Sequence, residues 1–472
     1  MSVTSAEQSA KLPVGKLSVV YAALALLVGA TYALHPLLPL GLGLTIGVFA
    51  FRRFVAFSAL FFAIVAFFFL VSPNVPPHEK HFRSPILFNG FLAQDALLFV
   101  ALFLFAINVA SENVAFPKPK TLVEKAFLLF AISFGCSLVV GVARGNRMEF
   151  FLTETRDFCY LLLFWLIIAY AARFERACEW FLVFVGFCAA FAVISVIDCA
   201  IRYKFARYNS GISFLLLGGF FFALSAFLVR EFEKNRALFA GLLIAFGFAI
   251  LIAYTRGLFL GLLVGLIVVM MRIGGRQAIR LTIVFALIAA VVLGTALLFG
   301  LTIDFMVEQT TKRGMEVSGG IDVSSAERVL EVVAVLNEMP NHPIFGAGVG
   351  ATIRVYRFTE LVGRVGMTDW WFIHNNYAQT LHKQGLFGLV ALLFLWLSAC
   401  WKSFSLFARA SEPKKKVLLL TSLGTLAGMM TISMTNSVMT YSNTNFLNAL
   451  LFAIVALIER EERERQTLAP ER

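Results

Sequence analysis

Runs of about 17–22 consecutive apolar residues recur along most of this chain, and their length limits what the chain can fold into. A helix of that length crosses the hydrocarbon core of a bilayer, whereas a spanning barrel strand is shorter and alternates apolar with polar side chains. These runs do not alternate. In addition, 60% of the 472 residues are hydrophobic and only 14% are charged, about half the charged fraction of a soluble domain. The sequence therefore predicts an all-α polytopic membrane protein.

The runs predict about 12 to 14 transmembrane helices. The expected spans lie near residues 17–34, 36–51, 54–72, 86–110, 126–142, 158–172, 180–200, 211–229, 237–254, 258–271, 281–300, 385–401, 417–434 and 445–458. They divide the chain into an N-terminal transmembrane region at 1–236, a central region at 237–405, and a C-terminal region at 406–472 that ends in a charged tail. The central region includes a long loop at 301–373, which we expect to lie outside the cytoplasm.

The 40 Lys and Arg residues predict the orientation of these helices. When the N-terminus is placed in the cytoplasm and the spans alternate, most of the cations fall in the short inside segments, and both termini are cytoplasmic. The net charge of +12 is therefore explained by topology and does not indicate a nucleic-acid partner. The cations that remain outside go against the rule, and a function should explain them.

Three of these outside cations are candidates for binding an anion. Arg256, in AYTRGLFLG, lies in a tight turn between two apolar runs. It could extend to lipid headgroups, or its planar guanidinium could bind a diphosphate. Arg156, in FLTETRDF, has Glu154 and Asp157 beside it, so a local salt bridge is the alternative. Arg207, in IRYKFARYNSG, could bind an anionic headgroup, although the tyrosines of that loop are typical of an interfacial belt.

The long outer loop contains one helix pattern, VSSAERVLEVVAVLNEMP at 323–340. Ser324 and Glu327 form a capping-box pattern. Apolar residues then recur at i, i+3, i+4 and i+7 and predict a single apolar face, made of Val329, Val332, Val333 and Leu336. A glycine-rich turn, FGAGVG, follows at 345–350.

Polar residues gather in WWFIHNNYAQTLHKQGLFG, residues 370–388, at the entrance to an apolar run. A helix that starts near His374 would place the imidazole at the outer face of the membrane. A lone histidine is most often a structural hydrogen-bonding group, and His382 lies near the same face of the helix. Gly385 and Gly388 would lie about three turns deeper, where small residues let neighbouring helices approach.

Three of these motifs occur in an order that resembles the shared region of the O-antigen ligase and O-antigen polymerase superfamily. They are TRGLFLGLLVGL, then SSAERVLEVVAVLNEMPNHPIFGAGVG, then HNNYAQTLHKQGLFG. The family pattern is Ser/Thr-Arg-Gly between spans, a loop helix that ends in a glycine-rich turn, and His-Asn followed after nine residues by Gly-x-x-Gly. The resemblance covers about residues 237–405, which makes the central region the ligase/polymerase-like core.

The resemblance implies a glycosyltransferase that acts at the periplasmic face of the bacterial inner membrane. Its donor would be a glycan on undecaprenyl diphosphate and its acceptor a sugar hydroxyl, either of the lipid A core in a ligase or of a second lipid-linked repeat in a polymerase. It would need no metal and no nucleotide sugar as cofactor. The sequence does not separate ligase from polymerase, and we favour the ligase. A lipid-linked sugar flippase is the alternative from another class, but we find no repeat between the two halves that would indicate one.

The resemblance also assigns roles to particular residues. His374 corresponds to the family's essential histidine and would be the catalytic base or a hydrogen-bond donor to phosphate. Arg256 corresponds to the arginine of Ser/Thr-Arg-Gly and would act in catalysis and in binding the donor diphosphate, with Arg156 and Arg207 as further diphosphate ligands. Asn375 and Asn376 would orient the histidine or the substrate: both follow His374 directly in the sequence.

Overall fold

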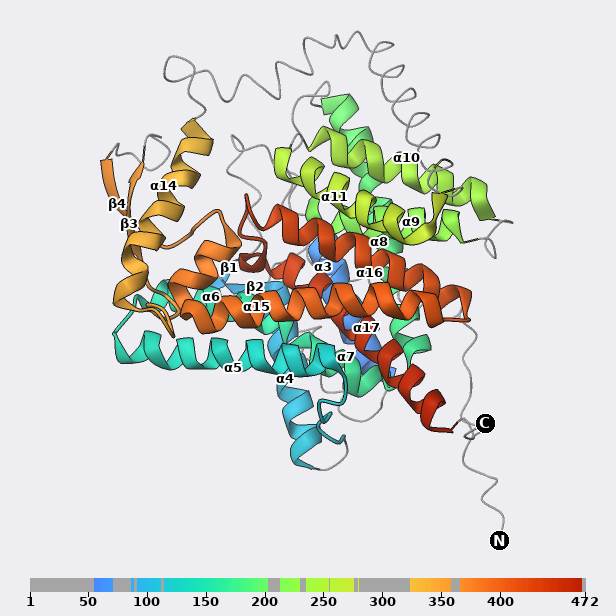
Figure 1. Cartoon of the computed structure of the whole chain (residues 1–472), viewed down its shortest axis with the longest axis horizontal. Helices are drawn as coiled ribbons and strands as arrows, with labels where there is room; N and C mark the ends of the chain where they lie inside the picture. The colour runs from blue at the N-terminus through green and yellow to red at the C-terminus, as the bar shows by residue number, and fades with distance from the viewer. Residues whose placement is uncertain are drawn as a thin grey trace. The chain divides into compact units, whose positions relative to one another are not determined.

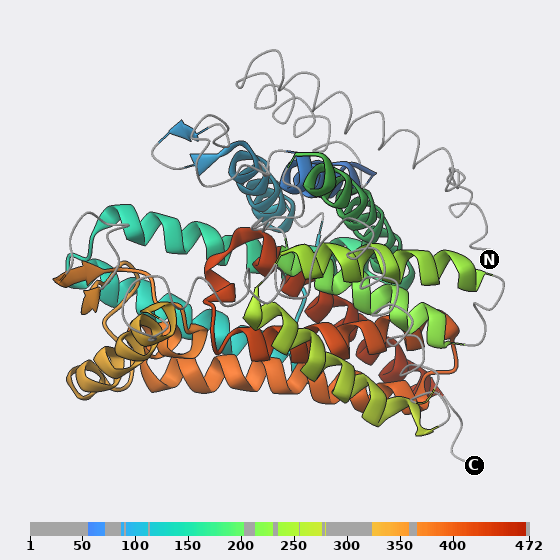
Figure 2. The ribbon, with the colours of Figure 1, turned by 90° about the horizontal axis from the view of Figure 1, so that it is seen from above.

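A computed structural model describes residues 55–70, 86–88, 91–111, 114–202, 213–229, 235–253, 255–275, 279, 323–357 and 366–468 (Figure 1). These residues form two compact units, one ending at Val114 and one beginning at Ala115. Figure 2 gives the view from above. The predicted spans at 17–34, 36–51 and 281–300, and also Arg207, lie outside the described residues.

The first unit contains two helices and a short hairpin. Helix α3 spans Val55–Leu70 and packs against α4, which spans Ala93–Ala110. Strands β1 (Ile86–Phe88) and β2 (Phe91–Leu92) pair antiparallel immediately before α4.

The second unit is a helical bundle with one antiparallel hairpin. Its helices are α5 (Leu122–Ala143), α6 (Met148–Leu161), α7 (Leu163–Ala171), α8 (Phe174–Arg202), α9 (Ser213–Leu228), α10 (Arg236–Ile252), α11 (Arg256–Ile273), α14 (Val323–Glu338), α15 (Asn376–Arg409), α16 (Pro413–Ile432) and α17 (Ser442–Leu468), with short 3-10 turns η2 (Met339–Asn341) and η4 (Val438–Thr440). The hairpin is β3 (Ile353–Arg357) with β4 (Gly366–Trp370).

Six helices in the described part of the chain are long and apolar enough to cross a membrane: α5, α8, α11, α15, α16 and α17. Helices α4, α9 and α10 are apolar but shorter. The prediction of an all-α polytopic membrane protein is therefore confirmed. Helix α17 lies at the centre of the bundle, where it packs against α5, α6, α7, α8, α9, α15 and α16 (Figure 1).

A glycine stripe joins α11 to α16. Gly257, Gly261 and Gly265 are four residues apart, so they share one face of α11. A Cβ atom at Gly261 would collide with the backbone oxygen of Gly428, and one at Gly265 with that of Gly424. The two backbones therefore approach closely, as in helix pairs built on small residues. This contact fixes the beginning of α11 beside the end of α16.

Helix α14 confirms the predicted loop helix, and most of the apolar face predicted for it is exposed. Val329, Val333 and Leu336 are 61%, 44% and 56% exposed. The buried residues are Glu327, Glu331 and Val335, which recur every four residues. The carboxylates can be buried because Arg357, from β3, pairs with both of them.

Helix α15 is broken at Gly385, whose φ of 68° lies in the left-handed region. Residues 343–348 pack into the break: the backbone oxygens of His382 and Lys383 accept from Ala347 and Gly348, and Leu386 and Phe387 donate to Pro343 and Ile344. A Cβ at Gly385 would collide with the backbone oxygen of Ile344. The small residue predicted to admit a neighbouring helix therefore admits a loop instead.

Candidate functional site

His374 lies in the linker between β4 and α15, and the first residues of α15 anchor it. The side chain of Asn375 caps the helix by accepting from the backbone N–H of Ala378 at 2.9 Å. The same side chain donates to the backbone oxygen of Met434 at 2.9 Å, and the backbone N–H of Asn376 donates to Ser433 at 2.8 Å. The turn 433–436 that follows α16 therefore holds the histidine segment in place.

Glu331, on α14, contacts His374 twice. One carboxylate oxygen accepts from the backbone N–H of His374 at 2.7 Å, and the other lies 2.9 Å from the ring nitrogen Nδ1. The carboxylate is fully buried, whereas the imidazole is 32% exposed. The ring also meets Phe372 edge to face, with centroids 4.9 Å apart. Among the described residues, Nε2 has no hydrogen-bond partner.

Arg357 is the counter-charge of Glu331. Its guanidinium lies 2.6 Å from Glu331 and 3.3 Å from Glu327, and it is 3% exposed. It also stacks over the ring of Trp370 at 4.4 Å. The hairpin β3–β4 thus holds the cation that allows a buried carboxylate beside His374. Sequence reasoning missed both residues, because periodicity singles out apolar positions and nothing in the local sequence pairs Glu331 of α14 with Arg357 of β3.

Arg256 is brought to the same end of the bundle as His374. It is the first residue of α11, and a Cβ at the next residue, Gly257, would collide with the side chains of Thr435 and Asn436. The turn 433–436 therefore contacts both the start of α11 and the segment of His374. We call this end of the bundle the site end.

Arg156 also lies at the site end. Its Nη2 is 3.0 Å from Asp157, so the local ion pair suggested by the sequence is present. Asp157 accepts in turn from Ser442 at 2.6 Å. Burial raises the pKa of the neighbouring Tyr441. The charge of Asp157 raises this pKa further, and the charge of Arg328 opposes the increase. The Tyr441 ring lies 6.3 Å from that of Phe372, which contacts His374.

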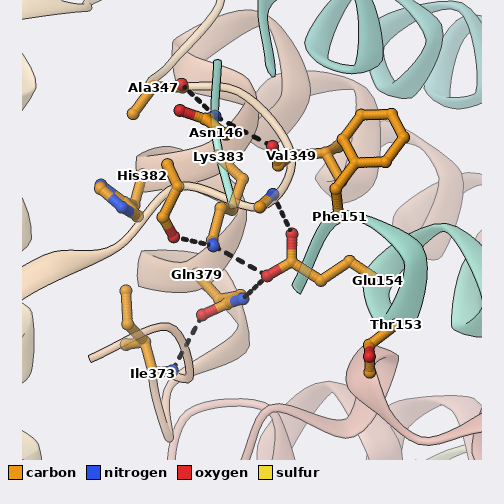
Figure 3. A network of polar contacts seen from close by, with 12 residues as sticks. Asn146, Phe151, Thr153, Glu154, Ala347, Val349, Ile373, Gln379, His382 and Lys383 are labelled. Atoms are coloured by element: carbon orange, nitrogen blue, oxygen red, sulfur yellow. Dashed lines mark hydrogen bonds and ion pairs between the residues drawn. The ribbon is translucent and has the colours of Figure 1, made fainter. Parts of the chain in front are cut away.

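A buried polar network lies directly behind the histidine segment (Figure 3). Glu154 pairs with Lys383 at 2.8 Å and accepts from the backbone N–H of Gly350 at 2.8 Å. Gln379 joins Glu154 to the backbone N–H of Ile373, the residue before His374. Because Glu154 is on α6 and Lys383 on α15, nothing in the local sequence pairs them.

The other candidate residues have structural contacts. His382 is buried, with its Nδ1 3.5 Å from Glu338 of α14, so only His374 of this pair is exposed. Asn376 is 1% exposed and lines a cavity of about 50 Å³ between α5, α6, α15 and α17. Its amide nitrogen and the side-chain oxygen of Asn445 are buried there without hydrogen-bond partners. The substrate-orienting role of Asn375 and Asn376 stays a prediction.

A comparison with known protein families also points to the region that contains His374 and Arg256. Residues 240–393 match the family model described as O-antigen ligase. A search of curated proteins finds no match. The matched segment begins in α10 and ends in α15, and it includes Arg256, Glu331 and His374 but not Arg156. Over residues 240–393, this membrane protein is therefore similar to the O-antigen ligase family.

Proposed function

We propose that this protein is an O-antigen ligase-like glycosyltransferase. It would move a glycan from undecaprenyl diphosphate to a sugar hydroxyl of the lipid A core at the periplasmic face of the inner membrane, with both termini in the cytoplasm. One observation carries the proposal: the imidazole of His374 lies at the same end of the bundle as Arg256 and Arg156. A buried carboxylate holds one of its nitrogens, and the other has no hydrogen-bond partner in the part of the chain that the structure describes.

The reaction breaks the bond between the anomeric carbon and the diphosphate oxygen, and it forms a bond from that carbon to the acceptor hydroxyl oxygen. The hydroxyl proton passes to Nε2 of His374, which acts as general base. Negative charge builds on the departing diphosphate. Arg256 and Arg156 would offset that charge beside a low-dielectric bilayer, where fixed cations act strongly, and Arg207 would add a third cation.

The arginines match the leaving group in geometry as well as in charge. A guanidinium donates several hydrogen bonds in one plane, which suits neighbouring phosphate oxygens better than the compact ammonium of lysine. Arg156 forms an ion pair with Asp157. This carboxylate would hold the guanidinium in position while the guanidinium also contacts the diphosphate.

Purified protein in proteoliposomes, supplied with lipid-linked glycan and lipid A core, tests the proposal. We expect transfer of the glycan to the core, and a loss of about 10²–10⁴-fold in His374→Ala. His342→Ala, in the same loop but bonded to Arg144, is the matched control and should retain activity. A correctly folded His374→Ala protein with full transfer would refute the role of the base.

The same assay separates the related activities. Growth of the glycan on its lipid carrier without use of the core indicates a polymerase, and movement of unaltered lipid-linked glycan across the bilayer indicates a flippase. Either product would replace the ligase assignment.

A further inference from the structure

We propose that Glu331 is the positioning residue of His374, and that it sets the tautomer in which Nδ1 carries the proton and Nε2 is the free base. This inference rests on the proposed function, because it concerns how His374 is prepared for proton transfer. It is carried by three features of the described residues: the double contact, the charge of the surrounding cluster and the docking of α14.

The double contact fixes both the backbone and the ring. The backbone N–H of His374 can only donate, and it donates to one carboxylate oxygen of Glu331 at 2.7 Å. The second oxygen, 2.9 Å from Nδ1, is also an acceptor. Since an ionised carboxylate has no proton to give, Nδ1 must donate. A neutral imidazole has one N–H, so Nε2 is left with its lone pair toward the exposed side.

The charges around Glu331 suit the cation that proton transfer creates. Glu331 and Glu327 share the single guanidinium of Arg357. Together these three side chains carry one net negative charge. When His374 accepts a proton it becomes positive, and a negative charge already sits 2.9 Å from its other nitrogen. A fixed opposite charge of this kind stabilises the state that forms during the reaction.

Docking of α14 places the carboxylate. Val335 is one turn beyond Glu331 and is 1% exposed, in a core cluster with Ile353 of β3 and Ile373 of the linker. The same cluster therefore contains the residue directly before His374. Glu331 and His374 are held by one packed core, as a base and its orienting carboxylate require.

The alternative is that Glu331 only folds the loop by pairing with Arg357. Glu327 offers a matched control, because it lies one turn earlier on α14, pairs with the same guanidinium at 3.3 Å and has no hydrogen bond or ion pair with His374. A role limited to folding would make the two glutamates equivalent.

Glu331→Gln is the decisive variant, with Glu327→Gln beside it. The oxygen of Glu331 that lies 2.9 Å from Nδ1 also lies 2.6 Å from Arg357, and the other oxygen accepts from the backbone N–H of His374. The single oxygen of a glutamine amide cannot accept at both positions, so Glu331→Gln loses one of these contacts together with the negative charge that stabilises the imidazolium. We expect kcat for glycan transfer to fall by about 10²–10⁴-fold, with the KM for the lipid-linked donor and the Tm close to those of Glu327→Gln.

The 15N NMR signals of imidazole-labelled protein supply the second readout, with His374 assigned by its loss in His374→Ala. We expect the Nδ1–H tautomer in the unmodified protein and in Glu327→Gln, and a mixture of the two tautomers in Glu331→Gln, where the amide no longer fixes Nδ1 as the donor. Equal kcat in the two glutamine variants, or an unchanged tautomer, would overturn the inference. If His374→Ala is fully active, the proposed function fails. If His374→Ala is inactive and Glu331→Gln is fully active, the positioning role fails and the proposed function stands.

Discussion

The two polar ends of the second unit differ in how their charged and polar side chains are paired. At the end remote from His374, Lys415 is fully buried with Glu461 at 2.7 Å, Glu412 at 3.3 Å and Glu462 at 3.6 Å. Glu459 there pairs with both Lys402 and Arg463. At the site end, three polar atoms have no hydrogen-bond partner among the described residues: Nε2 of His374, the amide nitrogen of Asn376 and the amide oxygen of Asn445.

The two ends also differ in which predicted group of cations they hold. The cations expected inside, such as Lys402, Lys415 and Arg460, are matched with carboxylates from other helices and tie α5, α15, α16 and α17 together. Those expected outside, Arg156 and Arg256, lie at the site end. The helix bundle therefore keeps these two predicted groups of cations at opposite ends.

Arginine substitution at each end of α11 gives the largest expected contrast. Arg256→Lys keeps the charge and loses the planar fork, so we expect transfer to fall by about 10²–10³-fold if the fork binds the diphosphate. Arg272→Lys is the control at the other end of the same helix, where the arginine stacks on Phe404 and Phe407. Glycan transfer in proteoliposomes measures both. Equal activity of the two variants would remove the diphosphate contact from the proposal.

Removal of the Lys415 charge should affect stability and spare the chemistry. Lys415→Met removes the cation shared by three carboxylates, of which Glu412 and Glu462 keep Arg465 and Glu461 does not. We expect a loss of roughly 2–3 kcal/mol, below the range for a fully buried pair because Glu412 and Glu461 are partly exposed. Thermal unfolding in detergent measures the loss, and kcat per folded molecule should be unchanged. A fall in kcat without a fall in Tm would erase the distinction between the two ends.

Two valines test which face of α14 is buried at the site end. Val335→Ala removes two methyl groups from a packed cluster and should cost about 2 kcal/mol. Val333→Ala, on the 44% exposed face, should change stability by less than about 0.5 kcal/mol. Unfolding midpoints of the two variants decide. A larger loss of stability in Val333→Ala than in Val335→Ala would show that the apolar face of α14 is the packed one.

The smallest effect concerns pH at the end remote from the site. A hydrogen bond from Arg465 lowers the pKa of Glu412, so this pair stabilises the fold above the ordinary glutamate pKa and loses its contribution as the pH falls. The group is exposed, and we expect only a few tenths of a kcal/mol. The Tm difference between the unmodified protein and Arg465→Ala should shrink from about pH 7 to about pH 4. A difference that grows on acidification would contradict this sign.

Local sequence was sufficient for features that depend on one segment. Apolar runs predicted the helices, and a cation against the topology rule pointed to Arg256 at the end where His374 is found. The contacts that sequence reasoning missed join distant segments: Glu331 to His374, and Glu154 to Lys383. Periodicity also could not show which face of α14 is buried, because it treats a carboxylate as exposed unless its partner, here Arg357, is known.

The interruption of α15 at Gly385 sets an order in which the protein can be assembled. The backbone groups that complete this helix belong to residues 343–348, which the ribosome releases first. Backbone groups left unpaired beside lipid cost free energy. The two halves of α15 can therefore complete their hydrogen bonds only once residues 343–348 lie beside Gly385.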